Sequence, residues 1–307
     1  GGAIEKIVYN MPPPFTSEFS YISLNRPSNF TQQQELMVNL GGSETNLILT
    51  DVMRKNILLE NRFIYNFGLA YLYGSNDMPG YTAFVSNPYS DPNSYRRNIN
   101  MLYGSESLTK DKMLVYSLIA QLTDPMNFYA FKSVFYDYII KGKHSSKVGM
   151  INLGNKLKYL PRYRFEYTPY GPELVYQNYF KLDSKLLLLS FSHSDPALQN
   201  SKRFATTIWN IKPTNHLSFN LSGQFWNQPY IQFYKSDELL VSEGFGGLLL
   251  TTANYDLNRN KHFYGFTIQL GYKSTGFALG EKLDKGIIFR AGMTFKLGDK
   301  SPTPSVK

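Results

Sequence analysis

The feature that most constrains the fold of this chain is a regular alternation of apolar and polar side chains across residues 156–297. In 217–225, leucine and phenylalanine alternate with serine, asparagine and glutamine, and 264–272 and 287–297 follow the same rule. A period of two places successive side chains on opposite faces of a β-strand. The pattern therefore predicts a series of antiparallel strands of about ten residues, the length that a tilted strand needs to cross a membrane.

The spacing of these strands adds a second indication. The turn at Asp183-Ser184 is short, whereas the connector 227–243 is long, and short and long connectors alternate between them and beyond. Outer-membrane barrels have short periplasmic turns and longer external loops. The predicted strands are 156–168, 172–182, 185–192, 203–211, 216–226, 244–255, 262–272 and 287–297.

Composition separates the possible classes of β protein. The chain has 24 Tyr and 22 Phe, which suits aromatic girdles at two membrane interfaces. The mean hydropathy is −0.31, and no stretch approaches 18 consecutive apolar residues, so no transmembrane helix is expected. The strands of a soluble sandwich or barrel also alternate apolar and polar side chains, but their water-facing side usually carries more Lys and Glu than these strands do. The pattern favours the membrane alternative over the soluble one.

The best-patterned region resembles a Gram-negative outer-membrane β-barrel. Residues 156–297 carry the resemblance, and Phe295-Lys296-Leu297 is similar to the end of the last strand of such barrels, although a polar tail, 298–307, follows it. The resemblance implies an antiparallel transmembrane β-barrel of about 10–14 strands, even in number, in the bacterial outer membrane. The chain begins Gly1-Gly2-Ala3 without Met, which indicates a processed or trimmed form.

The part of the chain before the barrel pattern is mixed. Residues 1–58 are expected to be partly irregular, with a possible strand at 19–24, a break at Gly41-Gly42 and no clear element at 47–60. Residues 59–106 are expected to form a strand at 62–73, where aromatic side chains alternate, followed by a loop.

A helical period replaces the strand period in residues 107–142. Apolar residues fall on one stripe in 109–122, and Asp124-Pro125 is a typical helix start, with Gly142 at the position of a C-terminal cap. The second predicted helix carries an aromatic stripe that is expected to be buried. We expect a helical hairpin over 109–141 that lies under the barrel on the periplasmic side or plugs its lumen; the stripe consists of Phe128, Phe131, Phe135 and Tyr138.

The alternation also assigns the two faces of the strands. Apolar rows are expected to face lipid, because polar groups in hydrocarbon are costly, and polar rows are expected to face the lumen. The predicted lipid-facing residues are Leu217, Phe219, Leu221, Phe266, Ile268, Leu270, Phe289, Met293 and Phe295. The predicted lumen-facing residues are Asn220, Gln224, Gln269, Arg290 and Lys296.

Candidate chemistry is sparse. His193 lies beside Ser192 and Ser194, which loosely resembles outer-membrane phospholipases and lipid A deacylases, where imidazole takes a serine proton. Neighbouring residues of a strand point to opposite faces, which makes a direct hydrogen bond between His193 and either serine awkward. The chain has no Cys, which excludes disulfides and thiolate metal sites, and no acidic spacing typical of calcium loops. We expect no metal and no cofactor.

Three functions remain open. The sequence favours a non-enzymatic, porin-like barrel: a plugged pore, a transport element or an accessory subunit of a larger outer-membrane complex. The alternatives are a lipid hydrolase that uses His193 and a barrel that binds an anionic glycolipid. A net charge of +9 could attract lipopolysaccharide phosphates. The expected partners are outer-membrane lipid, lipopolysaccharide and other outer-membrane or periplasmic proteins, but not nucleic acid, since no basic recognition motif is present.

Overall fold

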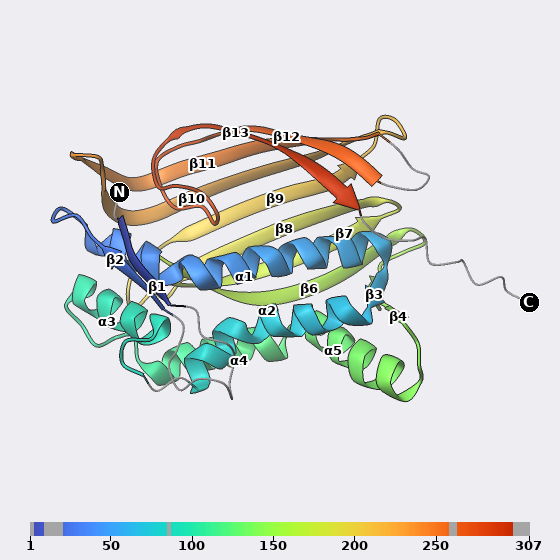
Figure 1. The fold of residues 1–307 in the computed structure, drawn as a ribbon, viewed down its shortest axis with the longest axis horizontal. Coiled ribbons are helices and arrows are strands. Elements are labelled where there is room, and N and C mark those ends of the chain that lie inside the picture. Colours follow the sequence, from blue (N-terminus) through green and yellow to red (C-terminus); the bar gives the residue numbers. More distant parts are fainter. Residues whose placement is uncertain (1–2, 9–20, 85–86, 258–262, 297–307) are drawn as a thin grey trace, which may run out of the picture.

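The main element of the fold is an antiparallel β-sheet of nine strands. In the computed structural model, residues 3–8, 21–84, 87–257 and 263–296 are described. The strands follow one another in sequence order as a meander (Figure 1). They are β5 (Ile151–Asn152), β6 (Leu157–Thr168), β7 (Gly171–Leu182), β8 (Lys185–Ser194), β9 (Lys202–Ile211), β10 (Leu217–Lys235), β11 (Glu238–Asp256), β12 (Phe263–Lys273) and β13 (Gly286–Lys296). The expectation of a mainly antiparallel β protein is confirmed.

The sheet does not close into a barrel. Strand β13 forms one edge and the two-residue strand β5 lies at the other, and the two do not pair with each other. Nine strands are fewer than the 10–14, in even number, that the sequence led us to expect. The stretch 62–73 accounts for part of the difference, because it contributes only β3 (Arg62–Ile64) and the start of helix α2 (Tyr65–Phe84).

The physical reason for the error at 62–73 is that two periods coexist in it. The aromatic residues alternate as in a strand, yet Gly68, Tyr71 and Gly74 recur at three-residue steps and are buried. A Cβ on Gly68 would lie 2.7 Å from a methyl group of Val134, so glycine permits close contact between helices at this point. Tertiary packing therefore decides in favour of the helical period.

The hairpin β10–β11 is longer than expected. Both strands continue through the residues that we had interpreted as a long loop, 227–243, and turn at Ser236, whose φ is +55°. A bulge between Gln228 and Ile231, which contains Pro229, inserts one extra residue into β10. This extra residue shifts the alternation by one position, which made the pattern look irregular in the sequence.

Helix α1 (Gln32–Glu60) lies along one face of the sheet and contacts β6, β8 and β10 (Figure 1). It starts at a capping box formed by Thr31 and Gln34 and passes through Gly41-Gly42 without interruption, so the expected break and the irregular segment at 47–60 were wrong. Each glycine weakens an isolated helix by about 1 kcal/mol, but most of a helix's stability in a protein comes from packing. The face of the sheet that α1 covers is called the inner face below, and the opposite one the outer face.

Further helices lie on the side of the sheet that ends in β6 and the short edge strand β5. They are α3 (Asp91–Tyr103), α4 (Lys110–Leu122), α5 (Pro125–Phe131) and the π-helix η1 (Lys132–Ile140). Helices α4 and α5 contact both α2 and β6. A further pair of strands, β1 (Ala3–Val8) and β2 (Tyr21–Asn25), forms a separate antiparallel sheet, and β4 (Ser145–Lys147) pairs with β3.

The region predicted as a helical hairpin contains helices, but they do not plug a lumen. Asp124 caps α5 through the backbone N–H of Met126, as the sequence suggested. The buried side includes Met126, Ala130, Ser133 and Val134. Of the predicted aromatic stripe, Phe128, Phe131 and Phe135 are exposed, whereas Tyr138 is half-buried and stacks on Tyr65. The expectation that this stripe is buried was wrong for its three phenylalanines, because the opposite side of the helices, with Ala130 and Val134, packs against Gly68 of α2.

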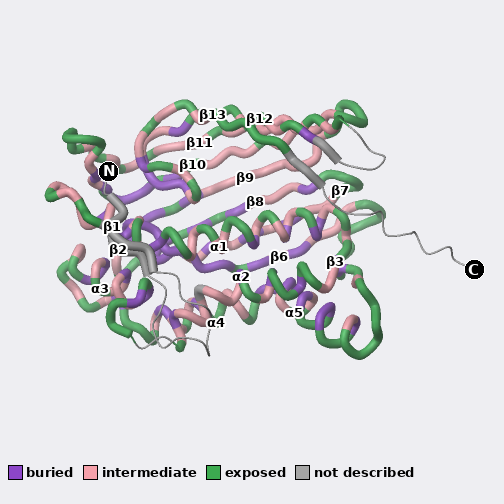
Figure 2. The backbone as a smooth tube through the Cα atoms, in the orientation of Figure 1, coloured by how far each residue is buried: buried purple, intermediate pink, exposed green. Residues whose placement is uncertain are grey.

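The buried part of the molecule is concentrated where helices meet strands β6, β7 and β8 (Figure 2). Strands β12 and β13 consist mainly of intermediate and exposed residues in the same view. The connector 274–285, between β12 and β13, returns to the inner face, where Phe277 packs against Tyr170 and the N–H of Gly280 donates to Glu44 of α1. Among the described residues, no helix is long and apolar enough to cross a bilayer.

Candidate functional site: a buried ion chain under an apolar face

The inner face carries a continuous chain of alternating charges, all of them buried except Asp51, which is half-buried. Four arginines and four carboxylates are joined pairwise through ion pairs from α1 and α5 to strand β9. In order, the chain is Arg54, Asp124, Arg162, Asp51, Arg164, Glu166, Arg203 and Glu173. Burying an isolated charge is very costly, so the alternation is what makes this arrangement possible.

Strand geometry brings the sheet members of the chain together. Arg162, Arg164 and Glu166 are alternate residues of β6 and therefore point to the same face. Glu173 of β7 stands directly opposite Glu166, a position at which like charges repel. The Arg203 guanidinium of β9 bonds to both carboxylates, at 2.6 Å from Glu166, and so neutralises the pair.

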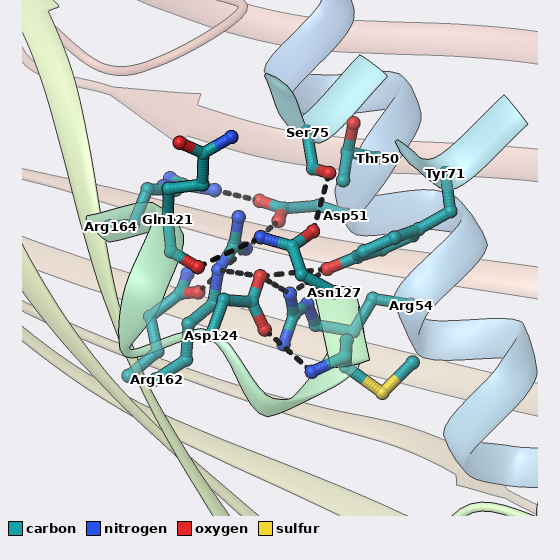
Figure 3. Close-up of polar contacts among 12 residues, drawn as sticks. Thr50, Asp51, Arg54, Tyr71, Ser75, Gln121, Asp124, Asn127, Arg162 and Arg164 are labelled. Atoms are coloured by element: carbon teal, nitrogen blue, oxygen red, sulfur yellow. Dashed lines mark hydrogen bonds and ion pairs between the residues drawn. The ribbon is translucent and has the colours of Figure 1, made fainter. Parts of the chain in front are cut away.

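The helical end of the chain is centred on Asp124 (Figure 3). Its Oδ2 atom accepts from the Tyr71 hydroxyl at 2.9 Å and lies 3.0 Å from Nε of Arg162, and it also pairs with Arg54. Its Oδ1 atom accepts from the backbone N–H of Met126 at 3.0 Å. Asp124 therefore joins the start of α5 to α1, α2 and β6 through one carboxylate.

The opposite end of the chain is enclosed by hydroxyl groups. Glu173 accepts from the hydroxyls of Tyr170 at 2.7 Å, Ser192 at 2.8 Å and Ser201 at 2.6 Å. The Nε atom of Arg203 donates to Ser192 at 3.1 Å. Glu173 is fully buried, and the hydroxyls supply the hydrogen bonds that water would otherwise provide.

Electrostatics set the protonation of the members that lie on α1. Burial by itself would raise the pKa of Asp51, but Arg164 and Arg162 outweigh this effect and hold the pKa below its usual value. Burial lowers the pKa of Arg54, and the like charge of Arg162 lowers it further, while Asp124 opposes both. The Nε and Nη1 atoms of Arg54 have no hydrogen-bond partner among the described residues.

This arrangement is suited to holding elements together rather than to proton transfer. A guanidinium does not deprotonate in proteins and cannot act as a general base. Among the described residues, no group of His, Asp and Glu side chains could hold a metal ion. A connected network of this kind fixes how its elements pack, because each of its four carboxylates is bound to a group on an element other than its own.

The residues predicted as weak catalytic candidates are not brought together. Ser192 and Ser194 are buried on the inner face, where Ser192 serves the ion chain and Ser194 accepts from the backbone N–H of Ser201 at 2.8 Å. His193 is exposed on the outer face, and its Nδ1 atom lies 3.1 Å from the carbonyl oxygen of Ser194. The imidazole and the two hydroxyls thus occupy opposite sides of the sheet.

The predicted lumen-facing residues share the inner face. Strand register places Asn220 opposite Thr252, Thr252 opposite Gln269, and Gln269 opposite Arg290. Arg290 donates to Gln269 at 2.6 Å and forms a two-pronged ion pair with Glu281. Gln224 lies further along the same row of β10, and the side chain of Lys296 is outside the described residues. An open lumen is absent from the described part of the chain, since α1 and the connector 274–285 occupy this side.

The predicted lipid-facing residues lie together on the outer face. Register aligns Leu221 with Thr251, Leu270 and Phe289, and the neighbouring rows align in the same way through Phe219 and Leu217. The side chain of Phe295 is outside the described residues. Contact with lipid itself stays a prediction, because no bilayer is part of the structure.

The outer face exposes many large apolar side chains between β8 and β13, beside a few polar ones such as His193. Many of these side chains are between 41% and 91% exposed, although a soluble monomer rarely exposes an apolar patch larger than a few hundred Å². The exposed residues include Phe191, Leu221, Phe225, Phe245, Leu249, Tyr255, Phe266, Ile268, Leu270, Tyr272, Ile287, Phe289 and Met293. Helices α4 and η1 add further exposed apolar residues, such as Leu122 and Ile140.

The ion chain was missed from the sequence, although part of its signal was present. Arg162, Arg164 and Glu166 alternate with aromatic residues in a predicted strand, a pattern that already placed three charges on one face. Asp51 and Arg54 lay in a segment without an interpretable period, so nothing indicated that they would meet these charges.

Comparisons with protein-family models, with curated proteins and with solved structures gave no match for this chain. The arguments about function therefore start from the fold and from its two contrasting faces.

Proposed function

We propose that this protein is an integral membrane β-sheet protein of the bacterial outer membrane, with a sealed inner face, that acts as an accessory subunit of a larger membrane complex. The single observation that carries the proposal is the distribution of polarity across the sheet. Large apolar side chains are exposed on the outer face, while four ion-paired arginines are buried beneath the inner face. A water-soluble sheet covered by helices on one side has the reverse arrangement.

The lengths of the strands support the same proposal. Strands β6 to β9 have 10 to 12 residues, and β10 and β11 have 19. A membrane strand needs about 9–11 residues when tilted by about 45°. The additional length of β10 and β11 would extend beyond the hydrocarbon, where Lys235 and Glu238 flank their turn.

The filled inner face favours a scaffold over an open pore. Helix α1 crosses β6, β8 and β10, and the ion chain ties it to β6 through Asp51 and to the start of α5 through Arg54. A conducting path through this side would require α1 to separate from several buried charge partners, each of which is costly to leave unpaired. We expect lipid vesicles that contain the intact protein to show no stable conductance.

One substitution on the outer face tests the membrane location. Ile268 is 47% exposed in the middle of β12. Arginine at this site should destabilise a membrane-embedded sheet by about 2–4 kcal/mol, whereas a surface substitution on a soluble protein usually changes stability by less than about 0.5 kcal/mol. The control Ile268→Phe keeps the site apolar.

The measurement is flotation with lipid vesicles followed by urea unfolding in the same vesicles. We expect the native chain and Ile268→Phe to float, and Ile268→Arg to insert poorly or unfold at a much lower urea concentration. A native chain that stays in the aqueous fraction as a monomer, with Ile268→Arg as stable as Ile268→Phe, would refute the membrane proposal.

A further inference from the structure

The free edge of the sheet at β13 is the strongest unassigned feature of the molecule. Strand β13 pairs with β12 over its whole length, from Gly286 to Lys273 and from Lys296 to Phe263, and with no other strand of the described chain. Alternate residues of an antiparallel edge strand point their N–H and C=O groups away from the sheet. We infer that this edge pairs with β13 of a second copy of the chain, so that two sheets continue into one another.

Strand β13 lacks the features that normally protect an edge strand from pairing with another chain. Natural edge strands carry proline, bulges or charges that discourage pairing. Residues 286–296 contain no proline, and β13 shows no register shift against β12. Its one described charged side chain, Arg290, lies on the inner face and is neutralised by Glu281. A regular strand of 11 residues is therefore left able to accept a partner.

The opposite side of the sheet is covered. Helices α4 and α5 contact β6, and Phe165 and Tyr167 of β6 pack among residues of α1, α3 and α4. The contrast indicates that the chain covers one edge by itself and leaves the other for a partner. The inference rests on the proposed membrane location, because open sheet edges are not tolerated in hydrocarbon.

Symmetry explains why a second copy fits this edge. Two identical antiparallel strands are related by a twofold axis perpendicular to the sheet, so the outer face of one copy continues as the outer face of the other. With the axis at Ala291, Phe289 stands opposite Met293 of the other copy, and both are apolar and exposed. The same register places Arg290 opposite Gly292, whereas an axis at residue 290 would oppose two arginines.

Cysteine cross-linking tests this register directly, because the native chain has no Cys. In the paired arrangement, the two Ala291 Cα atoms would lie about 4.5–5.5 Å apart, within the range of a disulfide. The control Ile287→Cys is exposed on the same face of the same strand, but its two copies would lie about 27 Å apart at about 3.4 Å per residue. A mixture of Phe289→Cys and Met293→Cys provides a second, heterologous pair.

The variants are reconstituted in lipid vesicles and oxidised, and the products are separated without reductant. We expect most of Ala291→Cys to form a covalent dimer, Ile287→Cys to stay monomeric, and Phe289→Cys to cross-link with Met293→Cys but not with itself. Monomeric Ala291→Cys in vesicles that the protein enters would overturn the pairing and leave the membrane proposal standing. Equal cross-linking of Ala291→Cys and Ile287→Cys would also overturn the pairing, because it would show that the disulfides form by random collision. Failure of the native chain to enter vesicles would instead reject the proposed function.

Discussion

Replacing Asp124 by asparagine isolates the role of one charge in the ion chain. Asparagine has nearly the same shape and is an equally good N-cap, so the bond to the N–H of Met126 is retained. What is lost is the negative charge that faces Arg54 and Arg162. Arg54 has no exposed surface and pairs with no other carboxylate among the described residues. Leaving such a charge unpaired should cost about 3–5 kcal/mol.

The reverse substitution, Arg54→Met, should be much milder. Asp124 would keep its contacts with Arg162, Tyr71 and the N–H of Met126. Two nitrogen atoms of Arg54 are already without a partner, so removing them relieves part of their desolvation. Methionine retains packing against Tyr71, and we expect a loss of about 1 kcal/mol or less.

The assay is urea unfolding of the two single variants and the double variant in the same lipid or detergent. The double variant should be more stable than Asp124→Asn alone by about 1–2 kcal/mol, because removing Arg54 removes the unpaired charge. Equal and additive losses from the two single variants would refute the reasoning, since they would mean that the charges act independently of one another.

Three further predictions concern the attachment of the helices and the exposed histidine. Burial would raise the pKa of Asp195, but Lys112, the N–H of Ala197 and the hydroxyl of Tyr116 hold it below its usual value. The contribution of the Asp195 carboxylate to stability should be present above about pH 4 and be lost on further acidification through the lowered pKa. When the free energy of unfolding is measured against pH, Asp195→Asn should lack this acidic decrease. Gly68→Ala should destabilise by about 1–3 kcal/mol because of the contact with Val134, while Gly41→Ala, which meets no atom within 4 Å, should stabilise by about 0.5–1 kcal/mol in thermal unfolding. His193→Ala should leave the free energy of unfolding in urea within about 0.5 kcal/mol of the native value, and a large loss would show that the exposed imidazole has a structural partner.

The sequence by itself determined most strands of the large sheet and the face on which their residues lie. The alternation in 264–272 and 287–297 defined β12 and β13 closely, because a period of two fixes the face of every residue once the segment is a strand. The same alternation correctly predicted that Ser192 and His193 lie on opposite faces of the sheet and that Gln269 and Arg290 lie on the same face. Asp124-Pro125 likewise determined a helix start, since a cap depends only on residues within one turn.

Only the tertiary structure decided whether the sheet closes and which charges meet. Asp51 and Arg162 are 111 positions apart in the sequence, and no local pattern in either segment indicates the other. The helical state of 65–84 likewise depends on the contact of Gly68 with a distant helix. Periodicity reports the environment averaged over one element, whereas closure, edge pairing and ion pairing depend on which elements come into contact, and that is set by packing across the whole chain.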